Sequence, residues 1–198
     1  MSEMDAETEL DPVALFGAWM KDAEASELND ANAVSLATAS RDGMPNVRMV
    51  LMKRVDERGF AFYTNAESKK GAELEENPRA AMCFHWKSLR RQVRISGSVT
   101  ELPSDDADEY FHSRSRLSQL GAVASQQSRV LASREVLVSR VEELQAEFPG
   151  EIPRPVYWKG YVLKPERIEF WKDGAGRLHD RFLFTRSGDG WRKERLFP

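Results

Sequence analysis

Alternating apolar and polar residues mark much of the chain, and this alternation predicts strands that bury one face. The clearest case lies in residues 91–102, where Val93, Ile95 and Val99 share one face. RDGM at residues 41–44 predicts a tight turn that joins two such segments as a hairpin. The predicted strands are residues 32–40, 46–55, 60–65, 80–86, 91–102, 160–165, 167–173, 177–186 and 190–197.

Helical periodicity replaces this alternation in five other segments. Asp11 is a good N-cap and Pro12 suits the first helical position, so the first helix is expected to begin there. Ser104 is the expected N-cap of a later helix. The expected buried positions of the first helix are Val13, Leu15, Phe16 and Trp19. The other helical segments are residues 67–77, 104–114, 118–128 and 133–148.

The order of these elements predicts the fold class. The strands follow one another without regular crossover helices, which argues against a doubly wound parallel sheet. Strands, then helices, then more strands are typical of an α+β protein, mainly antiparallel, built on a barrel. Residues 1–10 are expected to form a disordered tail and residues 11–198 a single domain, because no repeat or linker divides them.

Composition narrows the class of protein. The 198 residues are 41% hydrophobic and 31% charged, with a net charge of −3, as in an ordinary globular protein. No apolar run approaches the roughly 18 residues that cross a bilayer, and the N-terminus lacks the pattern of a secretory signal. Nucleic-acid binding would need a concentrated basic patch. We therefore expect a cytoplasmic protein that binds neither membranes nor nucleic acid.

Familiar catalytic motifs are absent from the sequence. It has no glycine-rich dinucleotide fingerprint, no phosphate-binding loop and no nucleophile elbow. Cys83 is the only cysteine, which excludes an internal disulfide and a thiolate-rich metal cluster. His85, His112 and His179 lack metal-ligand spacing, so no metal is predicted.

Cationic side chains recur at the ends of the predicted elements. Arg48 and Lys53 flank the apolar run MVLM. Ser68, Lys69 and Lys70 open a helix, where free N–H groups and the helix dipole favour an anion. Taken singly, such residues are more often solvated surface than a ligand site.

Two further groups strengthen the case for an anion. Tyr110, Arg114 and Ser118 follow i, i+4, i+8 spacing, so one helical face is expected to present a phenol, a guanidinium and a hydroxyl. This donor set suits a phosphate monoester.

The stretch RLHDRF at residues 177–182 adds a cationic face. If it is extended, Arg177, His179 and Arg181 point the same way, and their charges call for a compensating anion. The several groups together predict a protein that binds phosphorylated anions.

These residues lie in motifs that resemble those of one known enzyme family. RMVLMK, FYTN with SKKGAELEENPRAA, RRQVRISG, YFHSRSRLSQLGA, SQQS and IEFWKDGAGRLHDRF occur in the order typical of pyridoxine/pyridoxamine 5′-phosphate oxidases. The resemblance covers residues 11–198. It implies a split β-barrel homodimer with FMN at each of two subunit interfaces. It also implies oxidation of pyridoxamine or pyridoxine 5′-phosphate to pyridoxal 5′-phosphate, with dioxygen as acceptor and hydrogen peroxide as product.

The same resemblance assigns roles to individual residues. Arg177 and His179 are implied as the catalytic pair, with Arg177 covering the substrate ring on the face opposite the flavin. The implied substrate-binding residues are Lys53, Tyr110, Arg114, Ser118, Arg177, Leu178 and His179. The implied FMN-binding residues are Arg48, Met49, Val50, Leu51, Met52, Lys53, Tyr63, Thr64, Lys69, Lys70, Gln92, Gln127, Ser128, Trp171 and Arg181.

The chain departs from the family pattern at two points. Lys69 stands where the family often has arginine, which keeps the charge but loses the two-pronged contact. MSEMDAETELDP also lacks the Arg-Arg-Glu-Tyr motif that closes over the substrate in many members, so closure is expected to differ.

Three alternative functions stay open at the level of sequence. The first is a flavin oxidase of the same fold acting on another ring, as in the phenazine-pathway relatives. The second is a non-catalytic flavin- or haem-binding module, and the third a phosphate-binding regulatory domain. The phosphate-binding set of Lys53, Tyr110, Arg114 and Ser118 argues against the first two.

Overall fold

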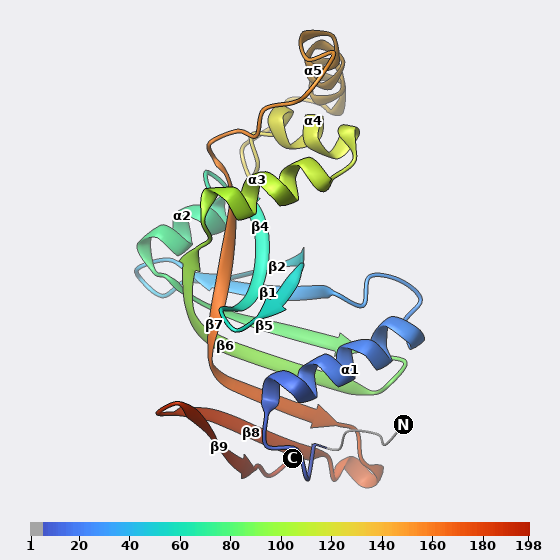
Figure 1. The fold of residues 1–198 in the computed structure, drawn as a ribbon, viewed down its shortest axis with the longest axis vertical. Coiled ribbons are helices and arrows are strands. Elements are labelled where there is room, and N and C mark those ends of the chain that lie inside the picture. The colour runs from blue at the N-terminus through green and yellow to red at the C-terminus, as the bar shows by residue number, and fades with distance from the viewer. Residues whose placement is uncertain (1–5) are drawn as a thin grey trace.

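The computed structural model describes residues 6–198, which form one curled sheet with helices at one end and across one face (Figure 1). The helices are α1 (Pro12–Ser26), α2 (Lys69–Glu76), α3 (Ser104–Ser113), α4 (Arg116–Ala124) and α5 (Arg134–Glu147), with a short 3₁₀ turn η1 (Ala175–Arg177). The strands are β1 (Ala33–Ala39), β2 (Pro45–Leu51), β3 (Arg54–Asp56), β4 (Gly59–Asn65), β5 (Arg79–Trp86), β6 (Arg91–Glu101), β7 (Trp158–Lys172), β8 (Asp180–Ser187) and β9 (Gly190–Arg195).

All neighbouring strands of the sheet are antiparallel, which confirms the predicted fold class. The order is β2-β1-β5-β6-β7-β4-β3, and β8 and β9 extend the sheet from β7. Strand β7 organises the sheet, because residues 158–163 pair with β4 and residues 167–172 pair with β8. One strand therefore connects the helical end of the molecule with the β8–β9 end.

The sheet bends where β6 meets the middle of β7. The register shifts between Ser96 and Gly97, and a Cβ on Gly97 would lie 2.0 Å from the carbonyl oxygen of Lys164. Pro165, which has no N–H to donate, faces Gly97 at this bulge. The two strands predicted at residues 160–165 and 167–173 are therefore one continuous bent strand.

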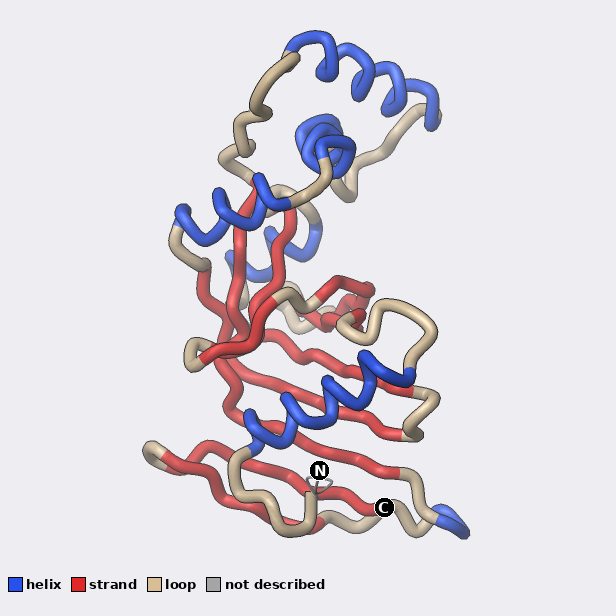
Figure 2. Tube along the Cα trace, turned by 45° about the vertical axis from the view of Figure 1, so that its right-hand side comes forward, coloured by secondary structure: helices blue, strands red, loops and turns tan. Residues whose placement is uncertain are grey.

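Helix α1 lies across the sheet and covers the main core (Figure 2). The side chain of Asp11 accepts a hydrogen bond from the N–H of Val13, and Pro12 is the first helical residue, as predicted. Phe16 meets Phe60 edge-on at 4.9 Å, and Trp19 meets Phe170 at 5.1 Å. Burial of each such ring contributes roughly 1.5–3 kcal/mol, so α1 is firmly attached to the barrel.

A smaller core lies under α3, α4 and α5 at the other end of β7 (Figure 1). Phe111, Leu120 and Leu144 pack there around Trp158, the first residue of β7. This cluster fixes α3 and α4 beside the end of β4.

Several predicted element boundaries are wrong. The helix predicted at residues 118–128 is α4, which begins at Arg116 and ends at Ala124, so Gln127 and Ser128 lie beyond it. The strand expected over residues 46–55 divides after Leu51, because Met52 donates its N–H to Asn32 while Lys53 donates to Ala61 on β4. The chain changes its pairing partner between these two residues. Ser104 is the first residue of α3 rather than its N-cap, which is Pro103.

The segment predicted as a tail lies partly outside the described residues, at 1–5. Residues 6–10 lie against β9, where Lys193 donates hydrogen bonds to the carbonyl oxygens of Glu7 and Glu9. No helix within residues 6–198 is both long enough and apolar enough to cross a membrane.

Candidate functional site

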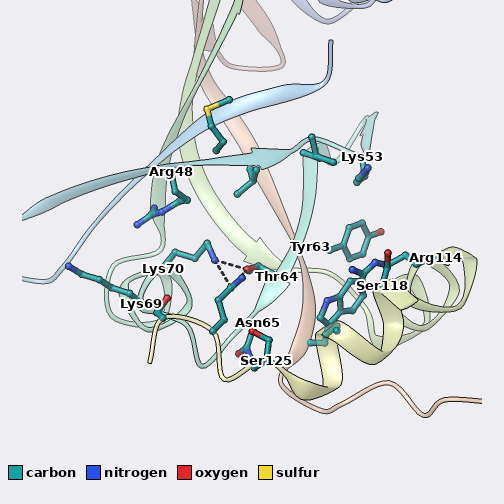
Figure 3. Close-up of a pocket in the computed structure, with 18 of the residues that line it drawn as sticks. Arg48, Lys53, Tyr63, Thr64, Asn65, Lys69, Lys70, Arg114, Ser118 and Ser125 are labelled. Atoms are coloured by element: carbon teal, nitrogen blue, oxygen red, sulfur yellow. Dashed lines mark hydrogen bonds between the residues drawn. The ribbon is translucent and has the colours of Figure 1, made fainter. Parts of the chain in front are cut away.

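A cavity of about 920 Å³ opens between β2, the end of β4, the start of α2 and the α3–α4 pair (Figure 3). Its volume is in the range of small-molecule and cofactor sites. Met52 is an exception among the predicted ligands of this region, because its side chain is buried in the main core. The predicted residues that line the cavity are Arg48, Met49, Val50, Leu51, Lys53, Tyr63, Thr64, Lys69, Lys70, Tyr110, Arg114, Ser118, Gln127 and Ser128.

One end of the cavity surrounds the amino group of Lys70, at the start of α2 (Figure 3). Nζ donates to Thr64 Oγ1 at 2.8 Å, to Gln127 Oε1 at 2.7 Å and to Ser68 Oγ at 3.2 Å. The pKa of Lys70 is lowered to about 8, mainly by burial and then by the nearby charge of Arg48, while the charge of Glu73 opposes both. A buried ammonium held mainly by neutral oxygens at a helix N-terminus is well suited to an anion.

The charge of Arg48 is already balanced within the chain. Its guanidinium donates to the carbonyl oxygen of Leu36 at 3.2 Å, to the hydroxyl of Thr38, and to Glu73 at 3.3 Å. Glu73 is buried and also accepts from Asn46 at 2.6 Å. Lys69 and Lys70 therefore supply most of the uncompensated positive charge at this end.

Aromatic rings and Arg114 form the other end of the cavity. Tyr63 stacks on Tyr110 with ring centroids 4.3 Å apart, and on Trp158 at 5.4 Å. The guanidinium carbon of Arg114 lies 5.2 Å from the centroid of Trp158, and Nζ of Lys53 lies 5.7 Å from that of Tyr110.

Arg114 carries an unsatisfied donor. Its Nη1 atom is buried, and it has no hydrogen-bond partner among residues 6–198. Burial lowers the pKa of this guanidinium. An unpaired buried donor costs about 1–3 kcal/mol, and more when it is charged, which an anionic ligand would relieve.

The predicted helical face of Tyr110, Arg114 and Ser118 is wrong, although all three residues line the cavity. Helix α3 ends at Ser113, and Arg114 is extended, with φ −77° and ψ 156°. Ser115 then caps α4 by accepting from the N–H of Ser118 at 3.3 Å. A helix–turn–helix, rather than one continuous helix, brings the three side chains together.

The remaining predicted ligands lie near the opposite end of β7, around η1 and β8 (Figure 1). Arg181 donates to Glu169 through Nε at 2.9 Å and Nη2 at 2.7 Å, and Arg94 donates to the same carboxylate at 3.2 Å. None of this second group lines the cavity described above. Its members are Gln92, Trp171, Arg177, Leu178, His179 and Arg181.

The stretch RLHDRF is not the extended strand that was predicted. Arg177 ends η1 with a left-handed φ of 64°, and β8 begins only at Asp180. Gly174 shapes this turn, because a Cβ there would lie 2.0 Å from the carbonyl oxygen of Leu178. Arg177 and His179 therefore do not share a strand face with Arg181.

His179 is held in place by the same turn. Its Nδ1 atom accepts a hydrogen bond from the N–H of Gly174 at 3.1 Å, and its ring lies 4.6 Å from that of Trp171. The same Nδ1 atom lies 3.2 Å from Oδ1 of Asp173, so Gly174, Asp173 and Trp171 together fix the orientation of the ring.

Several residues of the cavity have no counterpart in the sequence analysis. Asn65 donates to the carbonyl oxygen of Ser125 at 3.4 Å and joins the two sides of the Lys70 end. Asn46 accepts from Nζ of Lys69 at 3.0 Å. Trp158 supplies the floor of the Arg114 end. The only sequence signal for any of them is the segment VYW at residues 156–158, which contains Trp158 and precedes a predicted strand.

The fold and the cavity define a split-barrel protein with a cleft lined by cationic side chains. PhzG from Burkholderia lata 383, solved in complex with tetrahydrophenazine-1-carboxylic acid, has a TM-score of 0.93 and 32% identity to this chain, and the match covers 100% of this chain and 99% of PhzG. A pyridoxamine 5′-phosphate oxidase-related, FMN binding protein from Nostoc punctiforme shares the fold, with a TM-score of 0.75 at 19% identity and coverage of 96% and 100%. The predicted split barrel is thereby confirmed.

Sequence comparisons agree with the structural ones. Residues 20–148 match the family profile of pyridoxamine 5′-phosphate oxidase, and residues 158–198 match the pyridoxine 5′-phosphate oxidase C-terminal dimerisation region. The pyridoxine/pyridoxamine 5′-phosphate oxidase of Gluconobacter oxydans is 56% identical over 95% of this chain and 94% of its own length. That of Erythrobacter litoralis is 57% identical over 96% and 92%. The chain belongs to the pyridoxamine 5′-phosphate oxidase family.

Proposed function

We propose that this chain is an FMN-dependent oxidase that converts pyridoxamine and pyridoxine 5′-phosphate to pyridoxal 5′-phosphate, with dioxygen as acceptor and hydrogen peroxide as product. The observation that carries the proposal is one cavity with two cationic ends, Lys69 and Lys70 at one and Arg114 at the other. Two phosphorylated ligands, a cofactor and a substrate, suit two such ends. The names of relatives that are more than half identical over most of their length support the same reaction.

The Lys70 end fits the phosphate of FMN. Lys69, Lys70 and the positive end of the α2 dipole would hold the phosphate, and β2 and Gln127 would flank the ring system. When bound, FMN supplies the two-electron redox chemistry, and the protein supplies binding, orientation and exclusion of water. The absence of a nucleophile elbow from the sequence agrees with this division of roles.

The Arg114 end fits the phosphate of the substrate. The unsatisfied Nη1 of Arg114 would donate to it, with Lys53, Tyr110 and Ser118 as further donors around the same space. Because this end is separated from Lys70 within one cavity, the substrate would be held beside the cofactor by its own phosphate. Such fixed orientation of two reactants lowers a reaction barrier by several kcal/mol.

The second group of predicted ligands would complete the site from a partner subunit. The match of residues 158–198 to a dimerisation region indicates a homodimer, and this region contains Trp171, Arg177, His179 and Arg181. We propose that the cavity of one subunit faces the η1–β8 turn of the other. Arg177 and His179 would then contact the substrate, while Gln92, Trp171 and Arg181 would contact FMN.

Turnover of defined substrates tests this function. The protein loaded with FMN is expected to oxidise pyridoxamine 5′-phosphate in air, with uptake of one water and equal yields of pyridoxal 5′-phosphate, ammonia and peroxide. Pyridoxamine without its phosphate should be a poor substrate, because the Arg114 end would stay unfilled. No product from either phosphorylated vitamer, or equal turnover with and without the phosphate, would contradict the proposal.

The affinity for FMN is expected to fall in alkaline solution. Lys70 has a pKa of about 8 in the free protein, and a bound phosphate would raise it, because opposite charge favours the protonated form. Binding therefore takes up a proton once the pH exceeds this pKa. The Kd for FMN should be nearly constant from about pH 7 to 8 and then rise by up to about tenfold per pH unit.

Two lysine variants test whether Lys70 causes this pH dependence. Lys70→Met should weaken FMN binding at pH 7 and remove the alkaline rise in Kd. Lys69→Met should weaken binding but keep the rise, since Lys69 is exposed. Flavin fluorescence titrations give both constants, and an alkaline rise that persists in Lys70→Met would assign it to another group.

A further inference from the structure

An ionic cluster outside the cavity joins the two elements that carry the substrate-phosphate residues. Asp106, in the first turn of α3, accepts from Arg54 Nη2 at 2.8 Å and from Arg58 Nη1 at 2.9 Å. Asp56 lies behind the two arginines, 3.0 Å from Arg54 Nε and 2.9 Å from Arg58 Nη2. The carboxylate of Asp106 therefore ties α3 to the β3–β4 hairpin.

The cluster is partly buried and its geometry is specific. The side chain of Asp106 is 16% exposed, and Arg58 contacts both of its carboxylate oxygens, at 2.9 Å and 3.3 Å. Hydrogen bonds from Arg58 and then Arg54 hold the pKa of Asp106 below its usual range. A forked contact of this kind fixes orientation as well as distance.

The position of the cluster connects it to the cavity. Lys53 immediately precedes Arg54, and Tyr110 follows Asp106 by one helical turn on the same side of α3. The phenol of Tyr63 also reaches the carbonyl oxygen of Asp106 at 3.5 Å, while its ring stacks on Tyr110. The cluster thus fixes the position of Lys53 relative to Tyr110 and Arg114.

We propose that Asp106 is a positioning residue for recognition of the substrate phosphate: clamped between Arg54 and Arg58, it sets the distance between Lys53 and the Tyr110–Arg114 segment. This inference rests on the proposed function. Asp106 does not line the cavity and touches neither proposed ligand, so its effect passes through the placement of α3 against the hairpin. The FMN phosphate end, built on α2, lies outside its reach.

The charge of the cluster and its positioning role predict opposite effects of a substitution on phosphate binding. Arg54, Arg58, Asp56 and Asp106 balance as two positive and two negative charges. Asp106→Asn leaves one uncompensated positive charge near the substrate end, which by field alone would strengthen phosphate binding. Positioning predicts the reverse, because a neutral amide cannot hold both guanidinium groups.

The test compares Asp106→Asn with Asp105→Asn, both loaded with FMN. Asp105 is exposed one residue earlier in the same helical turn, so the control removes the same charge from the start of α3. We expect Asp106→Asn to raise the Michaelis constant for pyridoxamine 5′-phosphate about tenfold, with kcat and the Kd for FMN within about twofold. Pyridoxal 5′-phosphate binding, measured by calorimetry, should weaken by the same factor, and Asp105→Asn should leave both unchanged.

A second variant, Arg58→Lys, tests the proposal if Asp106→Asn does not fold. Arg58→Lys keeps the charge but loses the fork, and it should raise the same Michaelis constant by a smaller factor. An unchanged or lowered constant in Asp106→Asn, or in Arg58→Lys where Asp106→Asn does not fold, overturns the positioning role. Failure of the wild-type protein to oxidise pyridoxamine 5′-phosphate is a separate result, which contradicts the proposed function instead.

Discussion

Replacing Arg114 with alanine is expected to raise the Michaelis constant for pyridoxamine 5′-phosphate by about ten- to a hundredfold, while FMN stays bound. A hydrogen bond to a charged group contributes roughly 1.5–3 kcal/mol, and Nη1 of Arg114 has no other partner among the described residues. The FMN phosphate would lie at the other end of the cavity, so the Kd for FMN should not change. Steady-state kinetics and a flavin titration measure the two quantities.

The free protein gives this prediction an independent check. Because the Nη1 donor is buried and unsatisfied before substrate binds, Arg114→Ala should not lower the melting temperature of the FMN-loaded protein without substrate. Arg116→Ala is the matched control: Arg116 lies two residues away and donates to the carbonyl oxygens of Phe148 and Gly150 instead. It should leave the Michaelis constant unchanged. An unchanged constant in Arg114→Ala would remove Arg114 from the substrate site.

Two variants, each with a low kcat/KM, are expected to restore activity to each other when their subunits mix. Arg114→Ala damages the cavity, and Arg177→Asn damages the η1–β8 turn. Asparagine is the better replacement at position 177, because it tolerates the left-handed φ of 64°. If each site combines the cavity of one subunit with the turn of its partner, a mixed dimer contains one site with both halves intact.

The expected recovery can be calculated. Random exchange makes half of the dimers mixed, and half of their sites are intact, so about a quarter of the wild-type kcat/KM should return. Each variant alone serves as one control. A mixture assayed before its subunits have exchanged serves as the other. No recovery after verified exchange would mean that both halves belong to one subunit, and the roles of Arg177 and His179 would need to be reassigned.

The strand pattern was predictable because alternation reports burial directly. Val93, Ile95 and Val99 face the core as expected, since a half-buried strand needs apolar residues at every second position. The change of pairing partner between Met52 and Lys53 was not predictable, because it depends on which distant strand each N–H reaches.

The sequence predicted most of the residues that line the cavity, but not the secondary structure that brings them together. Helical spacing grouped Tyr110, Arg114 and Ser118. Ser115 nevertheless ends that periodicity, because it caps α4 instead of continuing a helix from α3, and hydrophobic periodicity does not distinguish these two conformations. The resemblance named residues one by one, but the separation of Arg177 from the cavity appears only in three dimensions. Asp106 had no sequence signal, because its role arises from contacts with Arg54 and Arg58.

The flavin spectrum under anaerobic conditions tests the central claim most directly. The protein loaded with FMN, mixed without oxygen with one equivalent of pyridoxamine 5′-phosphate per chain, is predicted to lose its visible flavin band and form about one equivalent of pyridoxal 5′-phosphate. Admission of air should restore the band and release peroxide. A flavin band that stays unchanged while the substrate is demonstrably bound would contradict the account.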